Sequence, residues 1–269
     1  MWVSCRIGTA SHSLNELAFR VLQLPESNIR VSDVKDNNFR IAFGGFVEKN
    51  APERSKVHHA HNATRAFLVA LNVATIGMFY WASDPWVHPI YGVSDGPDLP
   101  PIRHGALVVH PFQKFEEIKE ITDLDVQNAL IIFGMLAKEK SPTLESEYAK
   151  GLLLLRMNFY ELNFCREAFM CFWRALENFV AARILRVTKL KNELRDFQRA
   201  LTTIGASDGL VNELKEVYVV RSSQAAHAQV AVRDITFDEA MKAKVFLDFV
   251  MHKTFKAQGV KLLEGVSSR

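Results

Sequence analysis

Apolar residues recur at intervals of three and four through most of the chain after residue 123, with short polar interruptions between the runs. This is the period of one buried face of an α-helix. It predicts helices over residues 123–138, 144–162, 165–185, 190–201, 207–227 and 236–256. Ser141-Pro142 is typical of a helix start, and Thr236 to Glu239 has the sequence of a capping box. Because brief links join these helices, we expect an antiparallel helical bundle.

The pattern before residue 123 is less regular. Residues 2–7 alternate loosely between apolar and polar, and residues 38–48 read as a strand interrupted by Gly44-Gly45. Helical spacing returns at residues 14–24 and 56–81, a loop rich in proline and glycine is expected at 82–104, and residues 107–109 resemble a short strand. The predicted fold is therefore mainly α, with a mixed α/β region over residues 1–140 and the helical bundle over residues 141–269.

One stretch raises the question of a membrane span. Residues 66–83 carry no charged side chain, but a spanning helix needs about 20 apolar residues, and this stretch includes Asn72 and Thr75. A buried helix of the core is the favoured interpretation, so no membrane partner is predicted. The N-terminus has Arg6 within its first residues and no apolar run of signal-peptide length.

Composition narrows the class of protein. Over 269 residues, 33 basic and 30 acidic side chains give a net charge of +3, which is too balanced to indicate nucleic-acid binding by itself. The three cysteines lack the spacing of a zinc site and are odd in number, which favours a cytoplasmic protein without disulfides. His58 and His61 share a helical face but have no third ligand nearby. Neither a metal nor a cofactor is predicted.

In residues 218–228, near the end of a predicted helix, an arginine and a histidine flank a run of small and polar residues. Arg221 and His227 are six residues apart, and six residues advance about 240° around a regular helix. The two side chains can therefore meet if the helix ends or bends between them, or if a site is shared between subunits.

With helices on both sides, this segment resembles the HEPN family (higher eukaryotes and prokaryotes nucleotide-binding). The resemblance covers about residues 143–255 and includes the Ala175-Leu176-Glu177 helix and the final helix at 236–256. It implies a homodimeric, metal-independent endoribonuclease, a hydrolase of toxin–antitoxin or antiviral-defence systems, with a cognate antitoxin or sensor protein as a further partner. The N-terminal region would then sense a trigger or select the RNA target.

The chemistry of the two side chains agrees with that expectation. Histidine has an unperturbed pKa of about 6.5, so it can accept and return a proton near neutral pH. Arginine keeps its charge and presents a planar fork to phosphate oxygens. We therefore expect His227 to act as general acid and base and Arg221 to stabilise the phosphoryl group, with one such pair from each subunit.

Further residues are predicted to assist. Ser222, Gln224 and Glu177 are candidate supporting residues, and Glu177 could either orient Arg221 or pair with Arg174. The candidates for contacts with the RNA backbone are Arg174, Arg183, Arg186, Lys189 and Lys191.

Less specific interpretations stay open beside these. Arg221 and His227 could simply interact with the carbonyl groups at a helix end, and the basic residues could form a solvated face. The alternative function is a non-catalytic module of an assembly that binds RNA, a nucleotide or a protein.

Overall fold

The computed structural model describes residues 2–23, 28–35, 37–45, 52–82, 92–94, 96–97, 115–139, 142–157, 163–225, 233–259 and 262. Its contacts divide the chain into two compact units, residues 1–139 and residues 140–262. This division lies beside the boundary predicted at 140/141. As expected, the protein is mainly helical, with a sheet in the first unit and packed helices in the second.

The first unit contains an antiparallel sheet in the order β3-β4-β1-β5, in which the start of β1 also pairs with β6. The strands are β1 (Trp2–Thr9), β3 (Ile29–Lys35), β4 (Asn38–Gly44), β5 (Phe79–Trp81) and β6 (Gly92–Ser94). A separate parallel pair joins β2 (His12–Ser13) to β7 (Lys119–Glu120). The strand predicted at 38–48 is confirmed up to Gly44, and Gly45 follows it with φ +74°, where a side chain would be strained.

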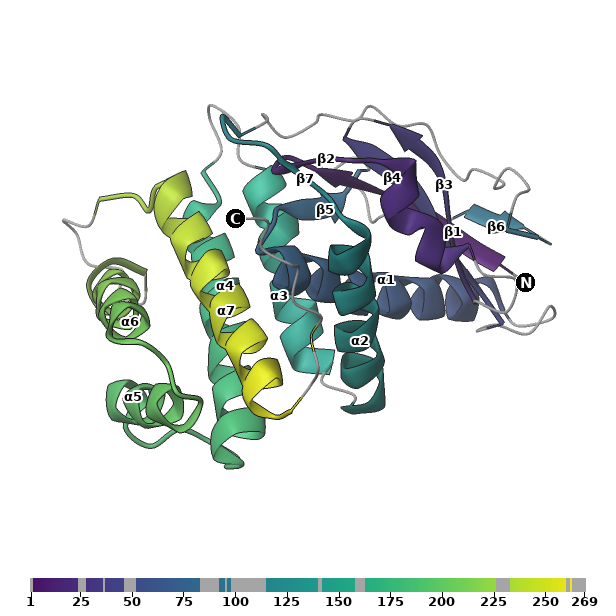
Figure 1. The fold of residues 1–269 in the computed structure, drawn as a ribbon. Coiled ribbons are helices and arrows are strands. Elements are labelled where there is room, and N and C mark those ends of the chain that lie inside the picture. The colour runs from purple at the N-terminus through teal and green to yellow at the C-terminus, as the bar shows by residue number, and fades with distance from the viewer. Residues whose placement is uncertain are drawn as a thin grey trace, which may run out of the picture. The chain divides into compact units, whose positions relative to one another are not determined.

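Two helices pack on this sheet, α1 (Glu53–Thr75) and α2 (Asp123–Glu139) (Figure 1). Phe43 of β4 lies between them, with its ring centroid 6.2 Å from that of Phe67 in α1 and 6.3 Å from that of Phe133 in α2. Phe67 and Phe133 are 5.9 Å apart, so the three rings form one cluster. This cluster places both helices on the same face of the sheet and buries the apolar positions of β4.

The helix expected at 56–81 ends earlier, at Thr75. Ile76 adopts a left-handed conformation with φ +48°, and the chain then enters β5. The Asn72 side chain fixes this turn, because it donates to the carbonyl of Phe79 (3.0 Å) and accepts from the Phe79 N–H (3.0 Å). Helical periodicity could not reveal this end, since buried apolar residues such as Val73 and Met78 lie on both sides of it.

Other expectations for the first unit were incomplete. Within the stretch 14–24 the structure has a short 3₁₀ helix, η1 (Glu16–Leu22), and β3 was not predicted. The proline-rich loop expected at 82–104 contains β6, because the start of β1 offers backbone groups with which Gly92–Ser94 can pair. The strand predicted at 107–109 lies outside the described residues.

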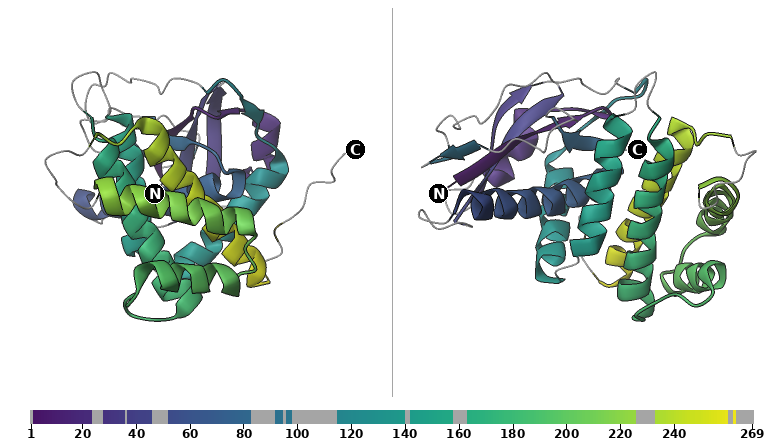
Figure 2. Two further views of the ribbon diagram at one scale, coloured as in Figure 1. Left: turned by 90° about the vertical axis from the view of Figure 1, so that its left-hand side faces the viewer. Right: turned by 180° about the vertical axis from the view of Figure 1, so that it is seen from behind.

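The second unit consists of helices, as the periodicity predicted. They are α3 (Pro142–Arg156), α4 (Cys165–Phe179), α5 (Glu193–Thr203), α6 (Asp208–Val220) and α7 (Phe237–Ala257). Two π-helical segments extend them, η2 (Val180–Leu185) after α4 and η3 (Arg221–Ala225) after α6. Helices α3, α4 and α7 lie side by side, and α5 and α6 run across one side of this layer (Figure 2). The capping box at Thr236 and Glu239 is confirmed.

The core of the second unit is aromatic. Phe169, Phe172, Trp173, Phe179 and Phe197 are each at most 1% exposed, so their rings fill the interior of this unit. Within the residues that the structure describes, no helix combines the length and apolar character needed to cross a bilayer.

Candidate functional site

Arg221 occupies an irregular turn of the chain. It follows α6 directly and begins the π-helical segment η3, in which the Ser222 hydroxyl donates to the carbonyl of Tyr218 at 2.6 Å. Such wide turns interrupt regular helices and are frequent at functional sites. The segment therefore supplies the departure from regular helical geometry that a site with Arg221 and His227 on one chain would require.

The ionic partner of Arg221 is Glu193, the first residue of α5. Arg221 Nη2 lies 3.0 Å from Glu193 Oε2, and the two side chains are 25% and 17% exposed. Asn192 caps α5, and the Asp196 carboxylate accepts from the backbone N–H groups of Lys191 (2.9 Å) and Asn192 (3.1 Å). This local network fixes the start of α5 and, with it, the backbone that carries Glu193.

A second carboxyl group lies beside Glu193. The indole Nε1–H of Trp173 donates to Glu177 Oε1 at 3.1 Å and to Glu193 Oε1 at 2.8 Å, so both carboxyl groups surround one donor. Burial, followed by the hydrogen bond and the charge of Glu193, raises the pKa of Glu177 to about 7, while Trp173 and Arg221 oppose this rise. Like charges at this separation disfavour ionisation of both groups. The pair therefore takes up a proton at a higher pH than an isolated glutamate does.

Aromatic packing holds the indole in place. The Phe197 ring of α5 meets Trp173 edge-on at 5.0 Å, and the Tyr218 ring of α6 lies 6.0 Å away. We refer to Trp173, Glu177, Glu193 and Arg221 as the polar cluster. Its members come from α4, α5 and η3, so it forms where these three elements pack together.

The remaining predicted residues of the site are not all described. His227 lies outside the described residues, and so does the side chain of Gln224. Of the alternatives for Glu177, the structure brings it into the polar cluster with Arg221, whereas Arg174 pairs with Glu147 at 2.7 Å. Ser222 is placed in the same turn as Arg221, where its hydroxyl bonds to the backbone.

The candidates for RNA-backbone contacts fall into two groups. Arg174 is engaged with Glu147, and the guanidinium carbon of Arg183 lies 5.9 Å from the centroid of the Phe255 ring. Arg186, Lys189 and Lys191 are exposed, and all three belong to the link between η2 and α5. This link leads directly into α5, whose first residue is Glu193 of the polar cluster.

Two members of the polar cluster, Trp173 and Glu193, were not predicted to belong to a site. The i, i+4 spacing of Trp173 and Glu177 places them on one helical face and is a usable signal. No local signal marks Glu193, because its role depends on how α5 packs against α4 and η3.

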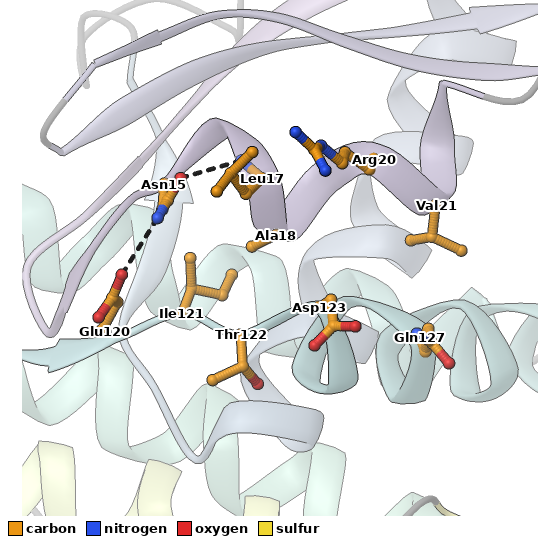
Figure 3. A pocket seen from close by; sticks show the side chains of 10 residues that line it. All are labelled: Asn15, Leu17, Ala18, Arg20, Val21, Glu120, Ile121, Thr122, Asp123 and Gln127. Atoms are coloured by element: carbon orange, nitrogen blue, oxygen red, sulfur yellow. Dashed lines mark hydrogen bonds between the residues drawn. The ribbon is translucent and has the colours of Figure 1, made fainter.

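The described residues provide few other sites. No group of three or more His, Cys, Asp and Glu side chains among them could hold a metal ion. In the first unit, a hollow of about 500 Å³ opens between η1 and the start of α2 (Figure 3). Leu17, Val21 and Ile121 contribute apolar lining, and Arg20 and Asp123 contribute charge. None of the residues predicted to act in catalysis lines this hollow.

Comparison with protein-family models, curated proteins and solved structures finds no match to this chain.

Proposed function

We propose that the protein is a cytoplasmic, metal-independent endoribonuclease of the HEPN type, acting as a homodimer in a toxin or antiviral-defence system. The observation that carries this proposal is the placement of Arg221, a partly exposed guanidinium that starts an irregular helical turn and is oriented by a carboxylate from another helix. The helical packing of the second unit and the motif that ends at His227 support the same conclusion.

The reaction follows from the chemistry of RNA. A base removes the proton of a 2′-hydroxyl group, whose oxygen attacks the adjacent phosphorus, and the bond to the 5′-oxygen breaks to give a 2′,3′-cyclic phosphate and a 5′-hydroxyl. The leaving oxygen needs a proton at that moment. His227 of one subunit would accept the first proton, and the same residue of the other subunit would donate the second. No metal is needed for either transfer.

Arg221 would stabilise the crowded phosphoryl group. A guanidinium carries five N–H donors, and Glu193 contacts Nη2. Arg221 Nε is buried and has no acceptor among the described residues. An unsatisfied buried donor costs about 1–3 kcal/mol, so a change of partners on binding an anion could recover part of that cost. The orientation imposed by Glu193 lowers the entropy lost when the phosphate binds.

The exposed positive charges between η2 and α5 would guide the RNA. Arg186, Lys189 and Lys191 are suited to contacts with the phosphate backbone that do not depend on sequence. Binding through such contacts weakens as salt is raised. The first unit would sense a trigger, select a target or bind an antitoxin.

The direct test is cleavage of RNA by the purified protein in excess EDTA. We expect the wild type to cleave and both Arg221→Ala and His227→Ala to lose about 10²–10⁴-fold in rate, since each removes a group that acts in the transition state. Arg233→Ala and His59→Ala are the matched controls, because they remove an exposed arginine and an exposed histidine outside the polar cluster. Sedimentation of each variant must show an unchanged oligomeric state.

A wild type that needs a divalent metal, or that retains its rate in both variants, would refute the proposal.

A second candidate is a non-catalytic module of an assembly that binds RNA, a nucleotide or a protein. The ion pair of Arg221 with Glu193 favours it, since the same contact would also join η3 to α5 in a protein without activity. RNA binding in EDTA, without cleavage by the wild type, would identify this function.

A further inference from the structure

The polar cluster contains more acidic than basic groups. Two carboxyl groups, Glu177 and Glu193, face one guanidinium, Arg221, and one neutral indole donor, Trp173. If both carboxyl groups were ionised, the cluster would carry one uncompensated negative charge in a partly buried place. A single proton on the pair balances the charge, because one carboxylate then remains for Arg221.

The contacts indicate which carboxyl group carries this proton. Glu193 has the ion pair with Arg221 at 3.0 Å and the shorter bond from Trp173, at 2.8 Å. Glu177 has the longer bond from Trp173, at 3.1 Å. Two charged groups of other elements face Glu177, namely Glu193 from α5 and Arg221 from η3, and they act in opposite directions. The neutral Tyr218 of α6 packs on the indole between them.

We propose that Glu193 is the positioning residue for Arg221 and that Glu177 carries the proton that makes this possible, so that an anion bound by Arg221 draws a proton onto the carboxyl pair. The inference rests on the proposed function in one respect, since the anion is taken to be a phosphodiester of RNA. The proton-holding pair is a property of the free protein.

The direction in which anion binding shifts the protonation of the carboxyl pair follows from charge. A bound phosphate shares the guanidinium with Glu193 and reduces the favourable effect of its positive charge on the carboxyl pair. The proton affinity of the pair then rises. Because burial and Glu193 raise the pKa of Glu177 to about 7, binding at that pH takes up about half a proton at most. Binding through this cluster therefore strengthens as pH falls through neutrality.

The first measurement is an NMR titration of the free protein labelled with ¹³C at the glutamate carboxyl carbons. We expect one resonance with a midpoint near 7 that is lost in Glu177→Gln. Glu193→Gln removes a like charge and should lower this midpoint, whereas Arg221→Ala removes a favourable charge and should raise it. Glu147→Gln is the control, because its carboxylate pairs with Arg174 outside the polar cluster and should leave the midpoint unchanged.

The second measurement is calorimetry with a short 2′-O-methyl oligouridine, which lacks the attacking hydroxyl and cannot be cleaved. Titrations in buffers of different ionisation enthalpy give the number of protons taken up. The background is His227→Ala, so that the imidazole does not contribute. We expect uptake in this variant and a clear reduction in the double variant Glu177→Gln/His227→Ala.

The outcomes separate this inference from the proposed function. A Glu177 midpoint near the ordinary 4.5 in the wild type, or equal proton uptake with and without Glu177, would overturn the inference and leave the nuclease proposal standing. If the Glu177 midpoint is near 7 but the oligouridine does not bind, both the coupling to an anion and the proposed RNA ligand are overturned. The wild-type midpoint requires no variant to fold.

Discussion

Among the described residues of the second unit, Tyr148 of α3 and Lys244 and Asp248 of α7 are polar side chains that are completely buried. Lys244 Nζ lies 2.7 Å from Asp248 Oδ2, and the Tyr148 hydroxyl donates to Asp248 Oδ1 at 2.6 Å. Burial lowers the pKa of Lys244 and raises the pKa of Asp248 and Tyr148, because it disfavours every charged form. Asp248 is therefore a partner shared by a buried ammonium and a buried hydroxyl.

This interdependence predicts a large effect of removing Asp248. Asp248→Ala leaves Lys244 and Tyr148 buried without their shared partner and should lower the free energy of unfolding by about 3–5 kcal/mol, as measured with urea. Lys242→Ala, on the same helix, breaks exposed ion pairs with Glu213 and Glu216 and should cost about 1 kcal/mol or less. Equal costs for the two variants would contradict the argument.

At the scale of single residues, the sequence could indicate only some members of the candidate site. Arg221 and His227 stand out because their spacing and chemistry are local to one segment. Glu177 could be predicted because it belongs to the Ala175-Leu176-Glu177 helix on which the family resemblance rests. Glu193 is not, because a glutamate at a helix start is ordinary and becomes a partner of Arg221 only through the packing of α5.

At the scale of elements, the spacing of apolar residues determines which helices and strands could be predicted. The helices of the second unit have an amphipathic stripe and clear breaks between them, so their existence could be predicted and their ends only approximately. Strand β3 has seven residues with two buried apolar positions, Ile29 and Val31, which is too weak a signal for a strand. The π-helical ends η2 and η3 leave no mark on the apolar pattern, because the apolar spacing of a single wider turn is close to that of α-helix.

The end of η2 leads to a prediction about Arg186. This exposed residue has φ +53°, a left-handed conformation that costs a non-glycine residue about 1–2 kcal/mol. Glycine is free of that strain but loses about 0.5–1 kcal/mol through greater freedom of the unfolded chain. Arg186→Gly should therefore raise the free energy of unfolding by about 0.5–1 kcal/mol in urea denaturation.

Lys189→Gly is the matched control for Arg186→Gly. Lys189 is exposed in the same link and is not among the described residues with positive φ, so glycine there should be neutral or destabilising. Both variants remove one positive charge and should weaken RNA binding alike, which separates the backbone effect from the charge effect. A loss of stability in Arg186→Gly would contradict the argument from strain.

At the scale of the whole molecule, the two units have separate sources of stability. The sheet and its aromatic cluster at Phe43, Phe67 and Phe133 lie within residues 1–139. The aromatic core around Trp173, the buried Asp248 network and the polar cluster all lie within residues 140–262. Every contact used to argue the site therefore falls inside the second unit.

This separation predicts that a chain of residues 140–262 folds by itself, since its length is that of an ordinary domain and its core is its own. We expect a helical circular-dichroism spectrum and one cooperative unfolding transition, with the Glu177 midpoint still near 7 because the groups that raise its pKa are retained. A spectrum without a cooperative transition would show that the helices need the first unit to fold. If the fragment folds and also cleaves RNA in EDTA, the first unit contributes selection or control. If the fragment folds and does not cleave, the first unit contributes to substrate binding or to assembly of the active form.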